Sequence, residues 1–267
     1  MPELKRDDIT LHFEVDGSGP PLVLNAGMLS DSATWAPLVP LLSDHFTLIR
    51  PDNRSTGRTV PHDAPNSAAH MAADVLALMD HLGHDAFHIA GHSMGGLMAM
   101  EIAGLAPDRV TTATVMASGR VRMPRTAAVF DGLLAIRQAP QGEELWLRAL
   151  YPWIFGQAFF ADPANVNTAL EAALAYPHAQ TAEGMAHQIE MFRAFRPKTD
   201  VSQLGCPILV LYAGQDVLVP PEVARPTFHP IPDLTEVTVP DAGHSIVWDA
   251  PQTVAEHLLA FLAQHSG

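Results

Sequence analysis

A serine between glycines, at a junction of two apolar segments, constrains the fold of this chain more than any other feature. The junction is Gly91-His92-Ser93-Met94-Gly95; an apolar run over 87–90 precedes it and an apolar run rich in small residues follows over 94–106. The first run is typical of a buried strand and the second of a buried helix. A serine on so tight a turn has a strained backbone and an exposed hydroxyl, while flanking glycines let the strand and helix approach closely. We therefore predict that Ser93 is a nucleophile.

Strand and helix signals alternate on both sides of this junction. Apolar residues spaced by three and four predict a helix over 68–82, and a last helix is expected over 253–263. Short apolar runs bounded by turn residues predict strands over 9–15, 22–24, 46–49, 87–90, 112–116, 208–211 and 235–239. Strands that alternate with helices imply a parallel sheet covered on both faces. The expected fold class is α/β, with a mostly parallel sheet flanked by helices.

The alternation stops between residues 119 and 200, where β-branched residues no longer cluster. We interpret 119–200 as a helical cap inserted over a core that is formed by 1–118 and 201–267. Helix-like pieces of this cap lie around 127–138, 143–151 and 165–175. Ligand pockets are mostly lined by apolar and aromatic side chains. The cap residues expected to line such a pocket are Trp146, Trp153, Phe159 and Met185.

Two further strands lead into loops that carry the partners a serine nucleophile needs. A serine hydroxyl needs a base to remove its proton, and the base needs an acid to orient it. The strand over 208–211 leads to Asp216, and the strand over 235–239 leads to His244. Parallel strands deliver such loops to one edge of the sheet. We expect Asp216 to orient His244 and His244 to deprotonate Ser93.

Acyl transfer also requires hydrogen-bond donors for the oxygen that becomes negative. We expect one donor to be the backbone N–H of Met94, the residue after the nucleophile. The second is expected in the loop that follows 22–24, with the N–H of Met28 as the candidate because Gly27 lets that backbone turn inward.

Four other polar or reactive residues have simpler interpretations. Asp241 and Asp249 compete with Asp216 as partners of the histidine, but we expect Asp241 in a turn and Asp249 at the start of the last helix. His92 is expected to pack beside the nucleophile or to support it. Cys206 is the single cysteine, which excludes an intramolecular disulfide, and we expect its thiol to be buried.

Charge and composition exclude several classes of partner. The chain has 29 acidic and 15 basic residues, a net charge of −14, which disfavours nucleic acid and anionic membrane surfaces. We see no signal peptide and no apolar stretch of the roughly 20 residues that a membrane helix needs, so the expected location is cytoplasmic. No metal-ligand spacing occurs, and the glycine-rich turn carries no lysine for a phosphate, so no metal or cofactor is expected. A homo-oligomer is compatible with the sequence.

Taken together, these residues and their order resemble the α/β-hydrolase superfamily over nearly the whole chain. Residues 51–59 resemble the loop D-x-R-G-x-G-x-S of that family, and 214–220 resemble its G-x-D-x-x-x-P. Two departures are Ala26, where the family usually has histidine, and Ser55, where it usually has glycine. Residues 25–27 and 91–96 are similar to those of enol-lactonases and small carboxylesterases.

The leading functional hypothesis is hydrolysis of a small-molecule carboxylic ester or lactone through an acyl-enzyme. Because a fold does not fix a function, three alternatives stay open. They are carbon–carbon bond hydrolysis of a vinylogous diketone, cofactor-free perhydrolysis of the haloperoxidase type, and a non-catalytic ligand receptor on the same fold.

Overall fold

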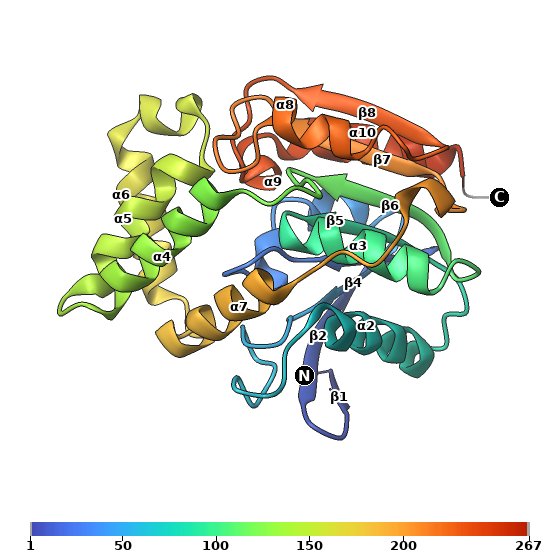
Figure 1. Cartoon of the computed structure of the whole chain (residues 1–267), viewed down its shortest axis with the longest axis horizontal. Coiled ribbons are helices and arrows are strands. Elements are labelled where there is room, and N and C mark those ends of the chain that lie inside the picture. The colour runs from blue at the N-terminus through green and yellow to red at the C-terminus, as the bar shows by residue number, and fades with distance from the viewer. Residues whose placement is uncertain (1, 266–267) are drawn as a thin grey trace.

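In the computed structural model, which describes residues 2–265, eight strands form one sheet in the order β1-β2-β4-β3-β5-β6-β7-β8 (Figure 1). The β1/β2 and β2/β4 pairs are antiparallel, and every other pair in this order is parallel. The strands are β1 Glu3–Lys5, β2 Thr10–Asp16, β3 Pro21–Asn25, β4 Thr47–Pro51, β5 Phe87–His92, β6 Val110–Met116, β7 Ile208–Ala213 and β8 Leu234–Val239. The predicted α/β class with a mostly parallel sheet is confirmed.

Helices cover both faces of this sheet. Buried side chains of α2 and α3 pack with strand residues in one apolar cluster, and those of α1, α9 and α10 pack in a second. The helices are α1 Val39–Leu42, α2 Ala68–Leu82, α3 Met94–Leu105, α4 Pro124–Gln138, α5 Gly142–Ile154, α6 Pro163–Ala175, α7 Ala182–Ala194, α8 Pro221–Ala224, α9 Ile246–Asp249 and α10 Pro251–Ala263. None of the helices described is long and apolar enough to cross a membrane.

Local signals set the ends of α2 where the sequence predicted them. The hydroxyl of Ser67 accepts a hydrogen bond from the N–H of His70, which satisfies a donor that the first turn leaves free. Gly83 ends the helix with a φ of 75°, a left-handed conformation that glycine adopts without steric cost. The sequence analysis missed β1, which has only three residues, and it missed α7.

The helices α4 to α7 lie between β6 and β7 in the chain. In Figure 1, α4, α5 and α6 stand together beside one end of the sheet, in green and yellow, and α7 leads back toward it. Side chains of these helices share an apolar cluster of their own, separate from the two that flank the sheet. We keep the name cap for residues 119–200 as our interpretation of this segment.

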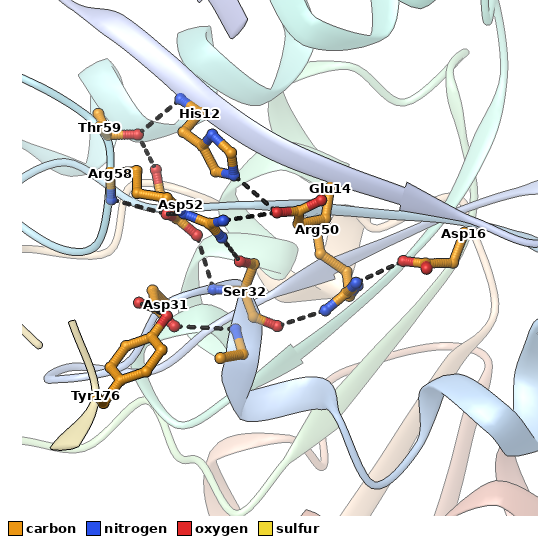
Figure 2. A network of polar contacts seen from close by, with 11 residues as sticks. His12, Glu14, Asp16, Asp31, Ser32, Arg50, Asp52, Arg58, Thr59 and Tyr176 are labelled. Carbon is orange, nitrogen blue, oxygen red and sulfur yellow. Dashed lines mark hydrogen bonds and ion pairs between the residues drawn. The ribbon is translucent and has the colours of Figure 1, made fainter. Parts of the chain in front are cut away.

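Figure 2 shows a polar network that joins the loops after β3 and β4 to the cap. Asp52 accepts hydrogen bonds from the backbone N–H groups of Ser32 and Arg58, each at 2.9 Å. Tyr176, just after α6, donates its hydroxyl to Oδ2 of Asp31 at 2.7 Å. Burial, together with the nearby Asp52, raises the pKa of Asp31. The tyrosine hydroxyl therefore satisfies a carboxyl group that is costly to leave unpaired.

A buried arginine fixes the loop after β4 against α2. Arg54 has 2% of its side chain exposed, and its Nε donates to Oδ2 of Asp74 at 2.6 Å. Its Nη1 donates to the carbonyl of Pro65 at 2.7 Å, and its Nη2 donates to Oδ1 of Asp8 at 3.1 Å. Burial alone would lower the pKa of Arg54, but the two carboxylates outweigh it and raise the pKa, so the guanidinium is always charged. Replacing Arg54 therefore removes a charged partner from the buried carboxylate of Asp74.

We predict that Arg54→Met lowers the free energy of unfolding by about 3 kcal/mol, because it removes the main partner of a buried carboxylate. Urea denaturation followed by circular dichroism measures this change. The matched control is Arg148→Met, since Arg148 pairs with Glu144 on the surface and such pairs contribute about 1 kcal/mol or less. Equal effects of the two substitutions would contradict the role given to Arg54.

Candidate active site

The turn between β5 and α3 holds Ser93 in a strained conformation. Its φ of 54° and ψ of −118° lie in a region that residues other than glycine rarely occupy. Two hydrogen bonds hold this backbone: the N–H of Ser93 donates to the carbonyl of Met116 at 2.9 Å, and its carbonyl accepts from the hydroxyl of Ser118 at 2.7 Å. Both partners belong to β6 or the residues just after it. The neighbouring strand therefore sustains the strain.

Two glycines near the serine let backbone segments approach each other more closely than any residue with a Cβ atom would allow. A Cβ atom on Gly95 would lie 1.9 Å from the carbonyl oxygen of Asn25, and one on Gly91 would lie 2.0 Å from the carbonyl oxygen of Gly95. Both distances are far below van der Waals contact. The turn that carries Ser93 thus packs tightly against the loop after β3, where a candidate oxyanion donor lies.

The structure brings the three predicted side chains together. Nε2 of His244 lies 2.9 Å from Oγ of Ser93, and Nδ1 of the same ring lies 2.7 Å from Oδ2 of Asp216. The other carboxylate oxygen of Asp216 accepts the backbone N–H groups of Leu218 and Val219, each at 2.8 Å. The carboxylate is fully buried. Because both of its oxygens are engaged, its orientation toward the imidazole is fixed.

The two competing acids do not contact the imidazole. Asp241 is exposed in the loop after β8. The expectation that Asp249 caps the last helix is wrong: Ala250 stands at that position, and no side chain caps α10. Instead, Oδ2 of Asp249 accepts the N–H groups of Gly243 at 2.7 Å and Gly156 at 2.8 Å. Asp249 thereby ties the loop that carries the histidine to the cap.

The two residues that carry the candidate oxyanion donors line the same cavity as the serine. Met28, Ser93 and Met94 all line a cavity of about 420 Å³. Within residues 2–265, the N–H groups of Met28 and Met94 donate no hydrogen bond to another part of the protein. Met94 is also the first residue of α3, where the helix dipole favours negative charge. Both N–H groups are thus free to bind an oxyanion.

Comparison with known proteins identifies the family of this chain. The family model of the alpha/beta hydrolase fold matches residues 20–251. This chain belongs to the α/β-hydrolase family. A relative from Azorhizobium caulinodans, named "Putative carbamate hydrolase RutD", is 30% identical and covers 99% of both chains. A thermophilic esterase from Thermogutta terrifontis is 25% identical with a TM-score of 0.86, over 99% of this chain and 100% of that one. An enol-lactonase from Burkholderia xenovorans is 23% identical with a TM-score of 0.85, over 98% and 100% of the two chains, and shows the shared fold.

The cavity of this α/β-hydrolase is not lined by the four cap side chains expected there. Trp146 and Met185 are buried in the apolar cluster of the cap itself. Phe159 packs at the edge of that cluster, where its ring stacks on Phe155 with centroids 4.0 Å apart. Trp153 lies under the guanidinium of Arg125. These large side chains pack the cap, while the cap residues that do line the cavity belong to the segment after β6, to α4, and to α7 and the residues just after it.

Helix α7, which the sequence analysis missed, reaches the core of the hydrolase at two loops. Oε1 of Gln188 accepts the N–H of Leu29 at 2.8 Å, directly beside Met28, and Leu29 has a φ of 66°. Ser55 also has a positive φ, of 67°, and its hydroxyl lies 2.9 Å from Nδ1 of His187. The departure from glycine at Ser55 therefore supplies a polar contact to α7. No local spacing in the sequence points to either contact.

His92 supports the loop of the candidate base. Its Nε2 donates to the backbone carbonyl of His244 at 2.7 Å, since a carbonyl can only accept. Complete burial, with His244 close by, lowers the pKa of His92 to about 4. The ring is therefore neutral at physiological pH. It holds the histidine loop from the nucleophile turn, as the expectation of a supporting role proposed.

The lowered pKa of His92 predicts a loss of stability in acid. Between pH 6.5 and 4 the unfolded chain binds a proton at this histidine that the folded chain does not, so stability falls as the pH decreases. From pH 8 to pH 5 the loss due to His92 is about 2 kcal/mol. In His92→Gln the amide N–H can still donate to the carbonyl but does not titrate, so we expect a weaker pH dependence. Urea unfolding of both proteins at the two pH values measures the difference, which must be near zero if His92 is not buried in its neutral form.

Proposed function

We propose that this α/β-hydrolase cleaves a carboxylic ester or lactone through an acyl-enzyme, with Ser93 as nucleophile, His244 as base and Asp216 as the orienting acid. The observation that carries the proposal is the continuous chain of hydrogen bonds from Asp216 through His244 to Ser93. It supports hydrolysis because a serine hydroxyl becomes a strong nucleophile only when a base is in place to accept its proton.

In the proposed first step, Oγ of Ser93 attacks the carbonyl carbon of the substrate while Nε2 of His244 takes the hydroxyl proton. Asp216 binds the Nδ1–H of the imidazole, which fixes the tautomer with a free lone pair on Nε2 and stabilises the imidazolium that forms. The substrate oxygen becomes negative and binds the N–H groups of Met28 and Met94. In enzymes where one such donor has been removed, the transition state loses about 3–4 kcal/mol of stabilisation.

The first step forms a tetrahedral intermediate. When it collapses, the bond to the leaving alcohol breaks, His244 gives its proton to that alcohol, and the acyl group stays on Ser93. A water molecule then takes the place of the alcohol, and His244 removes its proton in turn. The acid product leaves and the serine is restored. For a lactone the leaving alcohol remains part of the product, so the same steps open a ring.

Carbamate hydrolysis is a second candidate, favoured by the relative whose name is carbamate hydrolase and which matches over its whole length. A carbamate also has a carbonyl carbon that a serine can attack, and the same oxyanion donors would serve it. Comparing a carbamate, a linear ester and a lactone of equal size in one assay ranks these substrates by kcat/KM.

We predict that Ser93→Ala lowers kcat for p-nitrophenyl butyrate by about four orders of magnitude or more, since removing the nucleophile disables the whole catalytic group. The control is Ser202→Ala, because Ser202 is a half-buried serine that does not line the cavity and whose hydroxyl bonds Asp200 and Gln203. Its turnover is expected to match the wild type. Residual turnover in Ser93→Ala comparable to the wild type would reject Ser93 as nucleophile.

The same assay separates the remaining alternatives. Tight ligand binding without turnover would favour a receptor, and preference for a vinylogous diketone over every ester would favour carbon–carbon bond hydrolysis. Peracid formation from an acid and hydrogen peroxide would indicate perhydrolysis. Each of these outcomes would replace the ester or lactone assignment.

A further inference from the structure

The cavity beside Ser93 has a mixed lining. Most of it is apolar. On the cap side the apolar lining residues include Met123, Phe130, Ile189, Phe192 and Phe195. Such a surface fits the hydrocarbon part of a substrate. Three arginines are also among the lining residues: Arg120, Arg122 and Arg193.

The charge of this lining is opposite to that of the whole chain. Among the described residues that line the cavity there are three arginines and neither aspartate nor glutamate. The chain as a whole carries 29 acidic and 15 basic residues. A pocket with low-dielectric walls and charges of one sign attracts ligands of the opposite sign, whatever the net charge of the protein.

The three arginines differ in what they contact. Arg193 pairs with Asp131 on α4, which neutralises it. Arg120 donates to the carbonyl of Thr199 and lies 3.7 Å from Glu101. Arg122 is exposed, and within residues 2–265 it forms no hydrogen bond or ion pair. Its planar fork of donors is thus free to bind a carboxylate at two points.

We propose that the substrate carries a carboxylate on an apolar chain, bound by Arg122. This inference rests on the proposed function, because it identifies the substrate class of the same site. Arg122 lies four residues after Ser118, whose hydroxyl holds the carbonyl of Ser93. Four residues span at most about 14 Å, which sets an upper limit on the separation of Arg122 from this part of the site, and we take a six-carbon acyl chain as the spacer to test.

The test compares mono-p-nitrophenyl adipate with p-nitrophenyl hexanoate, two esters with six-carbon acyl chains that differ in a terminal carboxylate. We expect the wild type to favour the charged ester, and Arg122→Gln to lower the ratio of the two kcat/KM values about tenfold, as for loss of a hydrogen bond to a charged group. Arg122→Glu is expected to reverse the preference. Added salt should weaken the preference of the wild type.

The matched control is Arg125→Gln. Arg125 is also an arginine near the start of α4, but it stacks over Trp153 at 5.3 Å and is not among the lining residues. We expect it to leave the ratio unchanged. A wild-type ratio near one, or the same ratio in wild type and Arg122→Gln, would overturn the carboxylate site.

A binding measurement separates this inference from the proposed function. In Ser93→Ala, calorimetry with monomethyl adipate and dimethyl adipate reports recognition of the carboxylate without turnover. We expect tighter binding of the monomethyl ester, and loss of the difference when Arg122→Gln is added. If that difference appears while the wild type hydrolyses neither ester, the proposed hydrolysis is wrong and the carboxylate site stands. If the wild type hydrolyses both esters and neither binding nor kcat/KM depends on the carboxylate, the hydrolysis stands and the carboxylate site is wrong.

Discussion

The backbone strain at Ser93 is the constraint on which the rest of the site depends. A positive φ at a serine is unfavourable by about 1–3 kcal/mol and persists only if the surroundings determine it. Here they do so from two sides: β6 binds the backbone of the turn, and the loop after β3 contacts Gly95 so closely that a Cβ atom has no room. The same loop carries Met28, which lines the cavity of the serine. A single contact between loops therefore positions both the candidate nucleophile and the candidate oxyanion donors.

The cap stabilises these loops from the opposite side. Gln188 holds the N–H beside Met28, Tyr176 holds Asp31 in the same loop, and Asp249 joins Gly156 of the cap to the loop of His244. Each contact joins groups that are far apart in the chain. Displacement of the cap would thus disturb the candidate oxyanion donor and the candidate base together. The cap bounds the cavity and is also part of the support of the site.

The sequence predicted those parts of the site that depend on local order along the chain. The serine lies on a turn between a strand and a helix, and Asp216 and His244 each follow a strand. In a parallel sheet the ends of strands meet at one edge, so local order was enough to expect that the three side chains converge. The same reasoning gave the fold class and both ends of α2, where Ser67 and Gly83 carry strong local preferences.

Contacts between distant segments could not be read from the sequence. Large aromatic residues suggested a pocket lining, but a cap that stands beside the sheet needs a core of its own, and Trp146 fills that core. Asp249 stands just before a helix, where capping is common, yet two backbone N–H groups from other loops compete for its carboxylate. In both cases tertiary packing outweighed a local preference.

The net charge of the chain, like its local sequence patterns, does not predict what surrounds a ligand inside the cavity. A net charge of −14 disfavours polyanionic surfaces, because a long-range field acts on a large partner as a whole. A small substrate inside a cavity instead experiences the nearest side chains, since screening over about 10 Å removes most of the influence of the distant surface. The acidic surface and the arginines of the lining are therefore compatible. An anionic substrate would gain its binding energy only after it leaves the acidic surface and enters the cavity.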